Sequence, residues 1–216
     1  MDLLNETFKD IDEKVIQRLF DSQIQENKTL DYKREIKIKS NDEKKELLAD
    51  ITSFANTDGG IIIFGIEEKR NEKGENTGLP EKTVSLDVEN PDKFVQSLED
   101  IIHNNTDPKL STVQIKFINF KSAQLLILGV PKYIGLPFMV TLNSTNKFYK
   151  RRNTGKYLVD VYELSDVFLR NYKMKEKAEQ FRLQRISTVR DLEFLPNLDI
   201  NGSVFLHIIP LGYLDD

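Results

Sequence analysis

The sequence predicts an α+β fold, with helices flanking a mixed or antiparallel sheet, and three observations support it. Residues 40–55 carry a helical pattern that ends at a Gly-Gly pair, and Ile61, Ile62, Ile63, Phe64 and Ile66 follow as a β-favouring run with Gly65 inside it. Such a run is typical of a strand that is buried on both faces. Alternating apolar residues over 113–117 and an apolar segment over 125–130 predict two further strands, joined as a hairpin.

The helix before the Gly-Gly pair is delimited by local signals. Ser40 and Glu43 have the S-x-x-E spacing of a capping box, in which each side chain bonds to the backbone N–H of the other. Apolar residues then recur at helical spacing, namely Leu47, Leu48, Ile51, Phe54 and Ala55. Further helices are expected over 6–24, over 91–103 with Asn90 as N-cap, and over 162–190.

The remaining segments complete the predicted order. Residues 29–38 alternate between apolar and charged side chains, which predicts a half-exposed strand. Residues 69–80 are expected to form a polar loop, and 143–157 a strand and turn. An apolar strand over 204–209 either joins the main sheet or opens a second domain that is missing from this sequence. We therefore divide the chain into a domain over 1–172, with its core at about 20–170, and a basic helix plus strand over 173–216.

Composition limits the class of protein. The 216 residues are 39% hydrophobic and 31% charged, which is typical of a globular domain. No apolar run approaches the roughly 20 residues of a membrane span, and the acidic N-terminus has no signal-peptide pattern. The absence of cysteine excludes disulfides and thiolate zinc sites and favours a cytoplasmic protein. The two histidines, His103 and His207, match no metal motif.

Charge is unevenly distributed along the chain. The formal net charge of −4 argues mildly against nucleic acid as a partner. However, residues 143–190 carry 12 Lys or Arg against 5 Asp or Glu, whereas residues 191–216 carry none against 5. Cations interleaved with aromatic rings suit a surface that binds phosphates and bases, although a solvated hairpin explains the composition about as well. The candidate nucleic-acid-binding residues are Lys147, Tyr149, Lys150, Arg151, Arg152 and Lys156.

The turn after the capped helix is a second candidate site. Bare backbone amides of a Gly-rich turn bind anions, although the phosphate-loop pattern G-x-x-x-x-G-K-[ST] occurs nowhere in the chain. The alternative is a core helix-turn-strand unit with solvated glutamates where the strand ends. The turn residues are Asn56, Thr57, Asp58, Gly59 and Gly60.

Three blocks in this order resemble the Schlafen-type AlbA-like domain over about residues 20–170. The blocks are LDYKRE, SFANTDGGIIIFGIEE and FYKRRN. That domain is widespread in bacterial proteins described as DNA- or ATP-binding regulators, so the resemblance implies its fold and a nucleic-acid role. The final LHIIPLGYL is similar to segments that follow the domain in longer bacterial members.

The resemblance also implies a catalytic site. In the Schlafen branch that cuts tRNA, three carboxylates hold a divalent metal, and the matching positions here are Glu26, Asp31 and Glu68. Lys33 supplies the lysine of the same motif. Asp31 and Glu68 stand where the family pattern has Glu and Asp, so two side-chain lengths are exchanged. The implied cofactor is Mg²⁺ or Mn²⁺, which activates water and neutralises phosphate charge.

Three functions follow from these patterns. The first is a nucleic-acid-binding domain that acts as a metal-dependent endoribonuclease on structured RNA such as tRNA, so RNA is expected before DNA. The second is a non-catalytic DNA- or RNA-binding module of a regulator or defence protein. The third is an ATP-binding or oligomerisation module. A homodimer would bring two basic blocks of an acidic chain together.

Overall fold

The computed structural model describes residues 8–153 and 155–190, with Leu206 and Ile208. The chain divides into two compact units, one of Met1–Tyr133 with Pro137–Val159 and the other of Ile134–Leu136 with Asp160–Asp216. The boundary expected at 172 falls within helix α4 (Val161–Arg190) of the second unit. Apart from Leu206 and Ile208, the strand expected over 204–209 lies outside the described residues.

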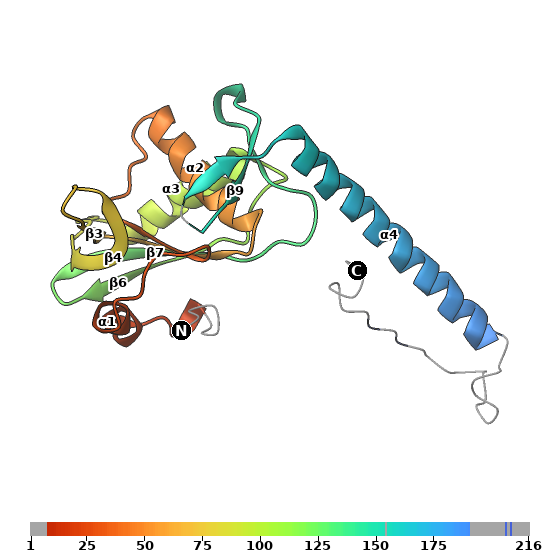
Figure 1. The fold of residues 1–216 in the computed structure, drawn as a ribbon, viewed down its shortest axis with the longest axis horizontal. Helices are drawn as coiled ribbons and strands as arrows, with labels where there is room; N and C mark the ends of the chain where they lie inside the picture. The colour runs from red at the N-terminus through yellow and green to blue at the C-terminus, as the bar shows by residue number, and fades with distance from the viewer. Residues whose placement is uncertain (1–7, 154, 191–205, 207, 209–216) are drawn as a thin grey trace. The chain divides into compact units, whose positions relative to one another are not determined.

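A four-stranded mixed sheet lies at the centre of the first unit (Figure 1). Its strand order is β1-β2-β7-β6. Strand β1 (Leu30–Lys33) pairs parallel with β2 (Gly60–Phe64). Strand β7 (Ala123–Val130) pairs antiparallel with β2 and with β6 (Gln114–Phe120). The prediction of an α+β fold with a mixed sheet is therefore confirmed, as is the hairpin over 113–130.

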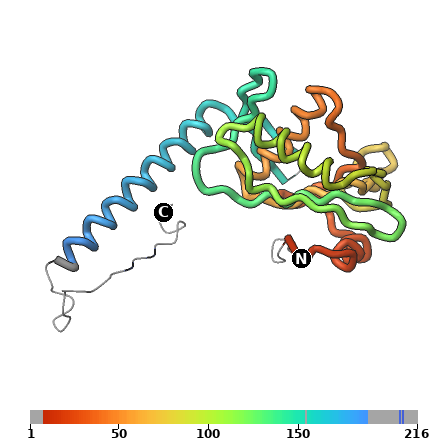
Figure 2. The backbone as a smooth tube through the Cα atoms, turned by 180° about the vertical axis from the view of Figure 1, so that it is seen from behind, coloured from red at the N-terminus to blue at the C-terminus, as the bar shows by residue number. Residues whose placement is uncertain are grey.

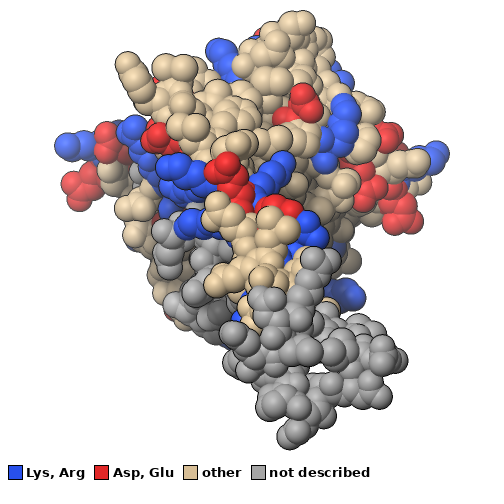
Figure 3. All heavy atoms as spheres, turned by 90° about the vertical axis from the view of Figure 1, so that its right-hand side faces the viewer, with Lys and Arg blue, Asp and Glu red and all other residues tan. Residues whose placement is uncertain are grey.

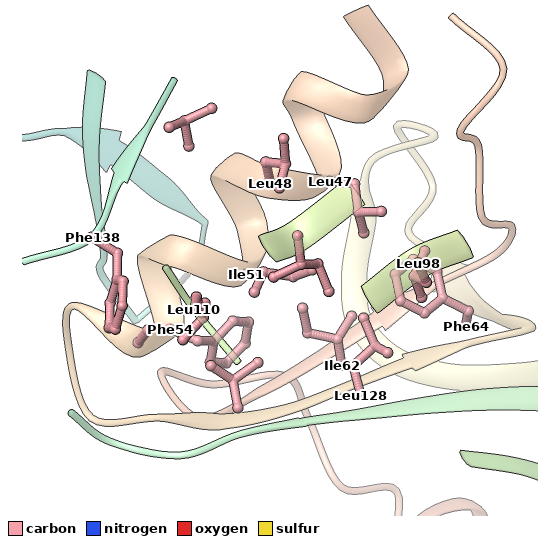
Figure 4. Close-up of a cluster of buried hydrophobic side chains, with 14 of the residues drawn as sticks. Leu47, Leu48, Ile51, Phe54, Ile62, Phe64, Leu98, Leu110, Leu128 and Phe138 are labelled. Carbon is pink, nitrogen blue, oxygen red and sulfur yellow. The ribbon is translucent and has the colours of Figure 1, made fainter. Parts of the chain in front are cut away.

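Helices cover both faces of this sheet, as Figures 1 and 2 show from opposite sides. Ile62 and Leu128 point into the core that the second and third helices close (Figure 4). Ile61, Ile63 and Ile127 point the other way, into the core closed by the first helix. Alternate residues of β2 thus pack into two cores on opposite faces of the sheet, which explains why every residue of β2 is buried. These helices are α1 (Glu13–Asp21), α2 (Asn41–Ala55) and α3 (Pro91–Asn104).

Two of the predicted helix starts are confirmed by their caps, whereas the helix expected over 6–24 is shorter, because α1 begins at Glu13 after the N-cap Asp12 and ends at Asp21. Ser40 Oγ accepts a hydrogen bond from the Glu43 N–H at 3.2 Å, and Glu43 Oε2 accepts one from the Ser40 N–H at 2.8 Å. Asn90 Oδ1 likewise accepts from the Lys93 N–H at 3.0 Å, with Pro91 as the first helical residue. These side chains satisfy backbone donors that a helix start leaves without a partner within the helix.

Two smaller sheets complete the first unit. One has the strand order β10-β9-β8-β5, and the other is the β3-β4 pair. The prediction of a polar loop over 69–80 is wrong, because the two ends of this segment pair with each other as an antiparallel hairpin. Register shifts interrupt the pairing within the hairpin. The bounds are β3 (Ile66–Arg70), β4 (Asn76–Thr83), β5 (Thr106–Asp107), β8 (Met139–Val140), β9 (Lys147–Arg151) and β10 (Lys156–Leu158).

The first strand differs most from its prediction. A half-exposed strand was expected over 29–38, but β1 has only four residues, and Leu30, Asp31 and Tyr32 are all buried. Leu30 and Tyr32 pack in the core closed by α1. Asp31 faces the other way, where the nearby Lys33 and the distant Arg151 neutralise its charge, so alternation here does not indicate solvent on one face.

In the second unit, α4 confirms the helix expected over 162–190. Within this unit, the Asn171 side-chain amide donates to the Gly135 carbonyl at 2.8 Å and to the Val167 carbonyl at 2.9 Å. None of the helices in the described ranges is both long and apolar enough to cross a membrane.

Candidate functional site

The turn between α2 and β2 is closed by its own hydrogen bonds. The N–H groups of Asn56, Thr57 and Gly59 donate to the carbonyls of Thr52 and Phe54 at 2.9–3.0 Å. These three amides therefore already have acceptors, which is not the arrangement of bare donors that an anion would require.

The two glycines of this turn are required by close backbone packing. Gly59 has φ +71° and Gly60 has φ +150°, where residues with a side chain are strained. A Cβ on Gly59 would lie 2.4 Å from the Lys132 nitrogen, and one on Gly60 would lie 2.3 Å from the Thr29 carbonyl oxygen. The Gly-Gly pair thus lets β2 enter the sheet between its neighbours.

Asn56 and Thr57 fasten distant segments to the end of α2. The Asn56 amide donates to the carbonyls of Phe138 and Tyr149 at 2.8 and 3.0 Å, and its oxygen accepts from the Phe138 N–H at 2.7 Å. Thr57 Oγ1 accepts from the Arg151 N–H at 3.0 Å. Together these bonds hold β9 and the segment before β8 against the helix.

Asp58 has a surface role in the same turn. Its carboxylate forms ion pairs with Lys28 at 2.6 Å and with Lys132 at 3.2 Å. The hydrogen bond from Lys28 lowers the pKa of Asp58, and the bond from Lys132 adds to this effect. The polar residues of the turn thus have structural partners in the described part of the chain.

The β9-β10 hairpin places its cations on two faces. Antiparallel pairing sets Lys156 opposite Arg151 and Tyr157 opposite Lys150. Because residues directly opposite share a face of the sheet, Arg151 and Lys156 lie on one face and Lys150 and Tyr157 on the other. We call these the inner and the outer face.

Arg151 and Lys156 of the inner face form ion pairs with carboxylates. The Arg151 side chain is 1% exposed, and its Nη2 donates to Asp31 Oδ1 at 2.9 Å. Lys156 Nζ contacts Glu46 Oε1 at 2.5 Å and Asp50 Oδ1 at 2.6 Å. Arg151, predicted as a phosphate ligand, therefore stabilises the domain from beneath its surface.

Tyr149 also belongs to the inner face. It packs against the core that α2 closes, and burial raises the pKa of its hydroxyl, with Lys156 opposing and Glu46 adding to the shift. The expected base-stacking role of Tyr149 is thus not favoured by its position, since a base would have to displace core contacts.

The outer face keeps its charges accessible. Arg152 is exposed and its guanidinium lies 4.6 Å from the centre of the Tyr157 ring, while Lys150 is partly exposed. Lys147, at the start of β9, is also exposed, although strand alternation places it on the same face as Tyr149 and Arg151. Tyr157 is the aromatic residue that the prediction omitted. Figure 3 shows that Lys and Arg side chains on one face of the molecule are interspersed with Asp and Glu.

The carboxylate cluster joins β1, α2 and the hairpin. Asp31, which is 4% exposed, has Lys33 Nζ at 2.8 Å from Oδ2 in addition to Arg151. Asp50 of α2 is 6% exposed and lies between Lys33, at 3.8 Å, and Lys156. Burial raises the pKa of Asp50, and the charges of Lys33 and Lys156 oppose that shift.

Asp50 was missed by sequence reasoning, although a signal exists. It stands three residues after Leu47 and four before Phe54, which places a carboxylate within the apolar stripe of α2. A buried carboxylate requires a charged or hydrogen-bonding partner. The stripe therefore indicates that some cation must reach this helix, but it does not say which one.

Glu26 and Glu68 are both hydrogen-bonded to the backbone of one residue of β4, Gly78. The Glu26 N–H donates to the Gly78 carbonyl at 2.8 Å, and the Gly78 N–H donates to Glu68 Oε2 at 2.9 Å. Glu68 Oε1 accepts from the Asn76 amide at 2.9 Å, and Glu26 Oε1 accepts from the Tyr32 N–H at 2.5 Å.

The pKa of Glu26 reports on its surroundings. Burial and then the charge of Asp31 raise it from 4.5 to about 7, the Tyr32 N–H opposes the shift, and Glu68 adds to it. The structure therefore brings Glu26 into electrostatic contact with the two other carboxylates that the sequence singled out.

The geometry does not fit a divalent metal as it stands. Within residues 8–153 and 155–190, no group of three or more His, Cys, Asp or Glu side chains is arranged to hold one. Both Asp31 oxygens face cations, and both Glu68 oxygens accept hydrogen bonds. Magnesium requires near-octahedral oxygen ligands at about 2.0–2.1 Å.

Two solved structures show how similar known folds are. The DIP2311 protein from Corynebacterium diphtheriae aligns with a TM-score of 0.47 and 16% identity, over 70% of this chain and 27% of that one. The N-terminal domain of a RecG-related protein from Nitrosomonas europaea aligns with a TM-score of 0.46 and 21% identity, over 66% and 91%. The chain thus spans about a quarter of the first protein. No curated protein matches.

A family model also matches the chain. The model described as Schlafen, AlbA_2 covers residues 26–160, which include the capped helix, the Gly-Gly turn, the carboxylate cluster and the β9-β10 hairpin. Because this match covers more than half of the 216 residues, the chain belongs to the Schlafen, AlbA_2 family.

Proposed function

We propose that this domain binds nucleic acid through the outer face of the β9-β10 hairpin, with RNA preferred over DNA. The observation that carries the proposal is the separation of the hairpin's charges. Carboxylates neutralise Arg151 and Lys156 on the inner face, whereas Lys150 and Arg152 lie with the Tyr157 ring on the outer face. Family membership supports a nucleic-acid-related role.

This face has the chemistry that a nucleic-acid strand requires. Cations contact phosphates and set the affinity, while a flat ring or guanidinium stacks on a base without selecting its identity. The Arg152 guanidinium already lies over the Tyr157 ring at 4.6 Å, so both planar groups are held in place before a base arrives. Such pre-organisation lowers the entropy lost on binding.

The inner face supplies the anchoring for this surface. The bonds from Asn56 and Thr57 to β9 and the ion pairs of Arg151 and Lys156 fix the hairpin to α2 and β1. The proposal therefore assigns the two faces different tasks, with anchoring on the inner face and ligand contact on the outer face.

The test is fluorescence anisotropy with labelled tRNA and with single-stranded DNA, over a series of salt concentrations. Lys150→Ala combined with Arg152→Ala should weaken binding and reduce the salt slope by about 1.4, since each phosphate contact on a single strand contributes about 0.7. The matched control is Lys93→Ala with Lys109→Ala, which removes the same charge from exposed positions elsewhere. Equal binding by the two double variants would refute the proposal.

A metal-dependent endoribonuclease is the second candidate, and the electrostatic contact of Glu26 with Asp31 and Glu68 favours it. The cations that pair with Asp31 count against it. The test is incubation of bulk tRNA with Mn²⁺, Mg²⁺ or EDTA, with Glu68→Gln as the comparison because Asp31 is buried and its replacement would disturb folding. Metal-dependent cleavage that Glu68→Gln loses would support this candidate, and intact tRNA would remove it.

A further inference from the structure

We infer that the ammonium group of Lys33 is the resident counter-ion of the carboxylate cluster and keeps divalent metal ions out of it. The inference is independent of nucleic-acid binding by the hairpin. It concerns Asp31, one of the three carboxylates that the sequence pattern assigns to Mg²⁺ or Mn²⁺, together with Asp50, which that pattern does not include.

The position of Lys33 follows from the strand. Lys33 comes two residues after Asp31 on β1, so the two side chains emerge on the same face. Its Nζ lies 2.8 Å from Asp31 Oδ2 and 3.8 Å from Asp50 Oδ2. The ammonium group of a lysine is charged at neutral pH, so Lys33 brings a full positive charge to both carboxylates.

The second oxygen of Asp31 is also occupied by a cation. Arg151 Nη2 donates to Asp31 Oδ1 at 2.9 Å, and its guanidinium lies 4.0 Å from the centre of the Phe54 ring. The backbone of Arg151 is bonded to Thr57 Oγ1. Arg151 therefore cannot move away from Asp31 without disturbing the core beneath α2.

Cations already outnumber carboxylates in this cluster. The carboxylates of Asp31 and Asp50 are surrounded by the three cations Lys33, Arg151 and Lys156. A divalent ion placed among the same oxygens would be repelled by an ammonium less than 4 Å away, and this repulsion is strong where water is partly excluded. Access is not the barrier, because the Lys33 side chain is 36% exposed.

Lys33 is therefore the group to remove. Unlike Arg151 it reaches solvent, so its replacement leaves no new buried cavity of the size that Arg151 would leave. Replacing it with methionine keeps most of the aliphatic stem and removes the charge. Asp31 and Asp50 then face two cations instead of three, so the repulsion that opposes a divalent ion at Asp31 Oδ2 and Asp50 Oδ2 falls.

The experiment titrates purified protein with MnCl₂ alone and follows the free Mn²⁺ signal by electron paramagnetic resonance. Lys33→Met should show one saturable Mn²⁺ site, and the wild-type protein should bind Mn²⁺ at least about tenfold more weakly than this variant. Lys33→Arg is the matched control, since it retains the charge and should gain nothing. Circular dichroism checks that each variant is folded, and Lys33→Gln replaces Lys33→Met if that variant is not.

Two results would overturn the inference. One is a wild-type protein that takes up Mn²⁺ as tightly as Lys33→Met. The other is a folded Lys33→Met or Lys33→Gln protein that binds no more Mn²⁺ than wild type, because the cluster would then exclude metal for another reason. Anisotropy with tRNA on the same preparations keeps this outcome separate from that of the hairpin.

Discussion

Replacing Asn56 with alanine tests whether the polar turn residues are structural. The Asn56 side chain makes three hydrogen bonds to the backbone of Phe138 and Tyr149. At about 0.5–1.5 kcal/mol for each bond, the loss should be about 2–4 kcal/mol of unfolding free energy. The upper part of that range is expected because Phe138 is 3% exposed, so water cannot easily replace the lost partner.

The assay is equilibrium unfolding in urea, followed by far-ultraviolet circular dichroism. Asn104→Ala, at an exposed position of α3, is the matched control and should change stability by less than about 0.5 kcal/mol. Asn56→Asp should be destabilised at least as much as Asn56→Ala, since it directs a carboxylate oxygen at two carbonyls. A loss below about 1 kcal/mol for Asn56→Ala would refute the reasoning and return this residue to the candidates for ligand binding.

Two further predictions concern buried charge. Arg151→Met should cost about 3 kcal/mol in urea unfolding, because Asp31 stays buried with Lys33 alone, and a cost below about 1 kcal/mol would contradict this. Glu26 has a folded-state pKa of about 7 against 4.5, so wild-type stability falls as pH rises between these values. Glu26→Gln should therefore have a free energy of unfolding about 1–2 kcal/mol above that of wild type at pH 8, after allowance for solvent, and should unfold at a higher temperature. Near pH 4 this advantage should be absent. An advantage that is equal at both pH values would exclude titration of Glu26 as its cause.

Local signals predicted the elements that depend on neighbouring residues. The capping box of Ser40 and Glu43, the N-cap Asn90 and the apolar run of β2 all act within a few residues, and the structure confirms each. The same holds for the β6-β7 hairpin, whose two strands are separated by a short turn.

Non-local charge pairing explains what the sequence could not show. Asp31 can be buried because Arg151 neutralises it, and Arg151 lies 120 residues later in the chain. Lys156 is likewise neutralised by carboxylates more than 100 residues earlier. The basic block was predicted to be a single surface, whereas strand pairing turns two of its five hairpin cations, Arg151 and Lys156, inward. Which cations turn inward depends on the register of β9 and on the position of α2, and neither is visible in the order of residues.

Gly78 makes the β3-β4 hairpin a mechanical link. Its carbonyl holds the backbone of Glu26 and its N–H holds the carboxylate of Glu68, so one residue of the hairpin positions two acidic side chains from different parts of the chain. A displacement of the hairpin at this point acts on both at once. The hairpin therefore ties the backbone at Glu26 to the carboxylate of Glu68 through one residue.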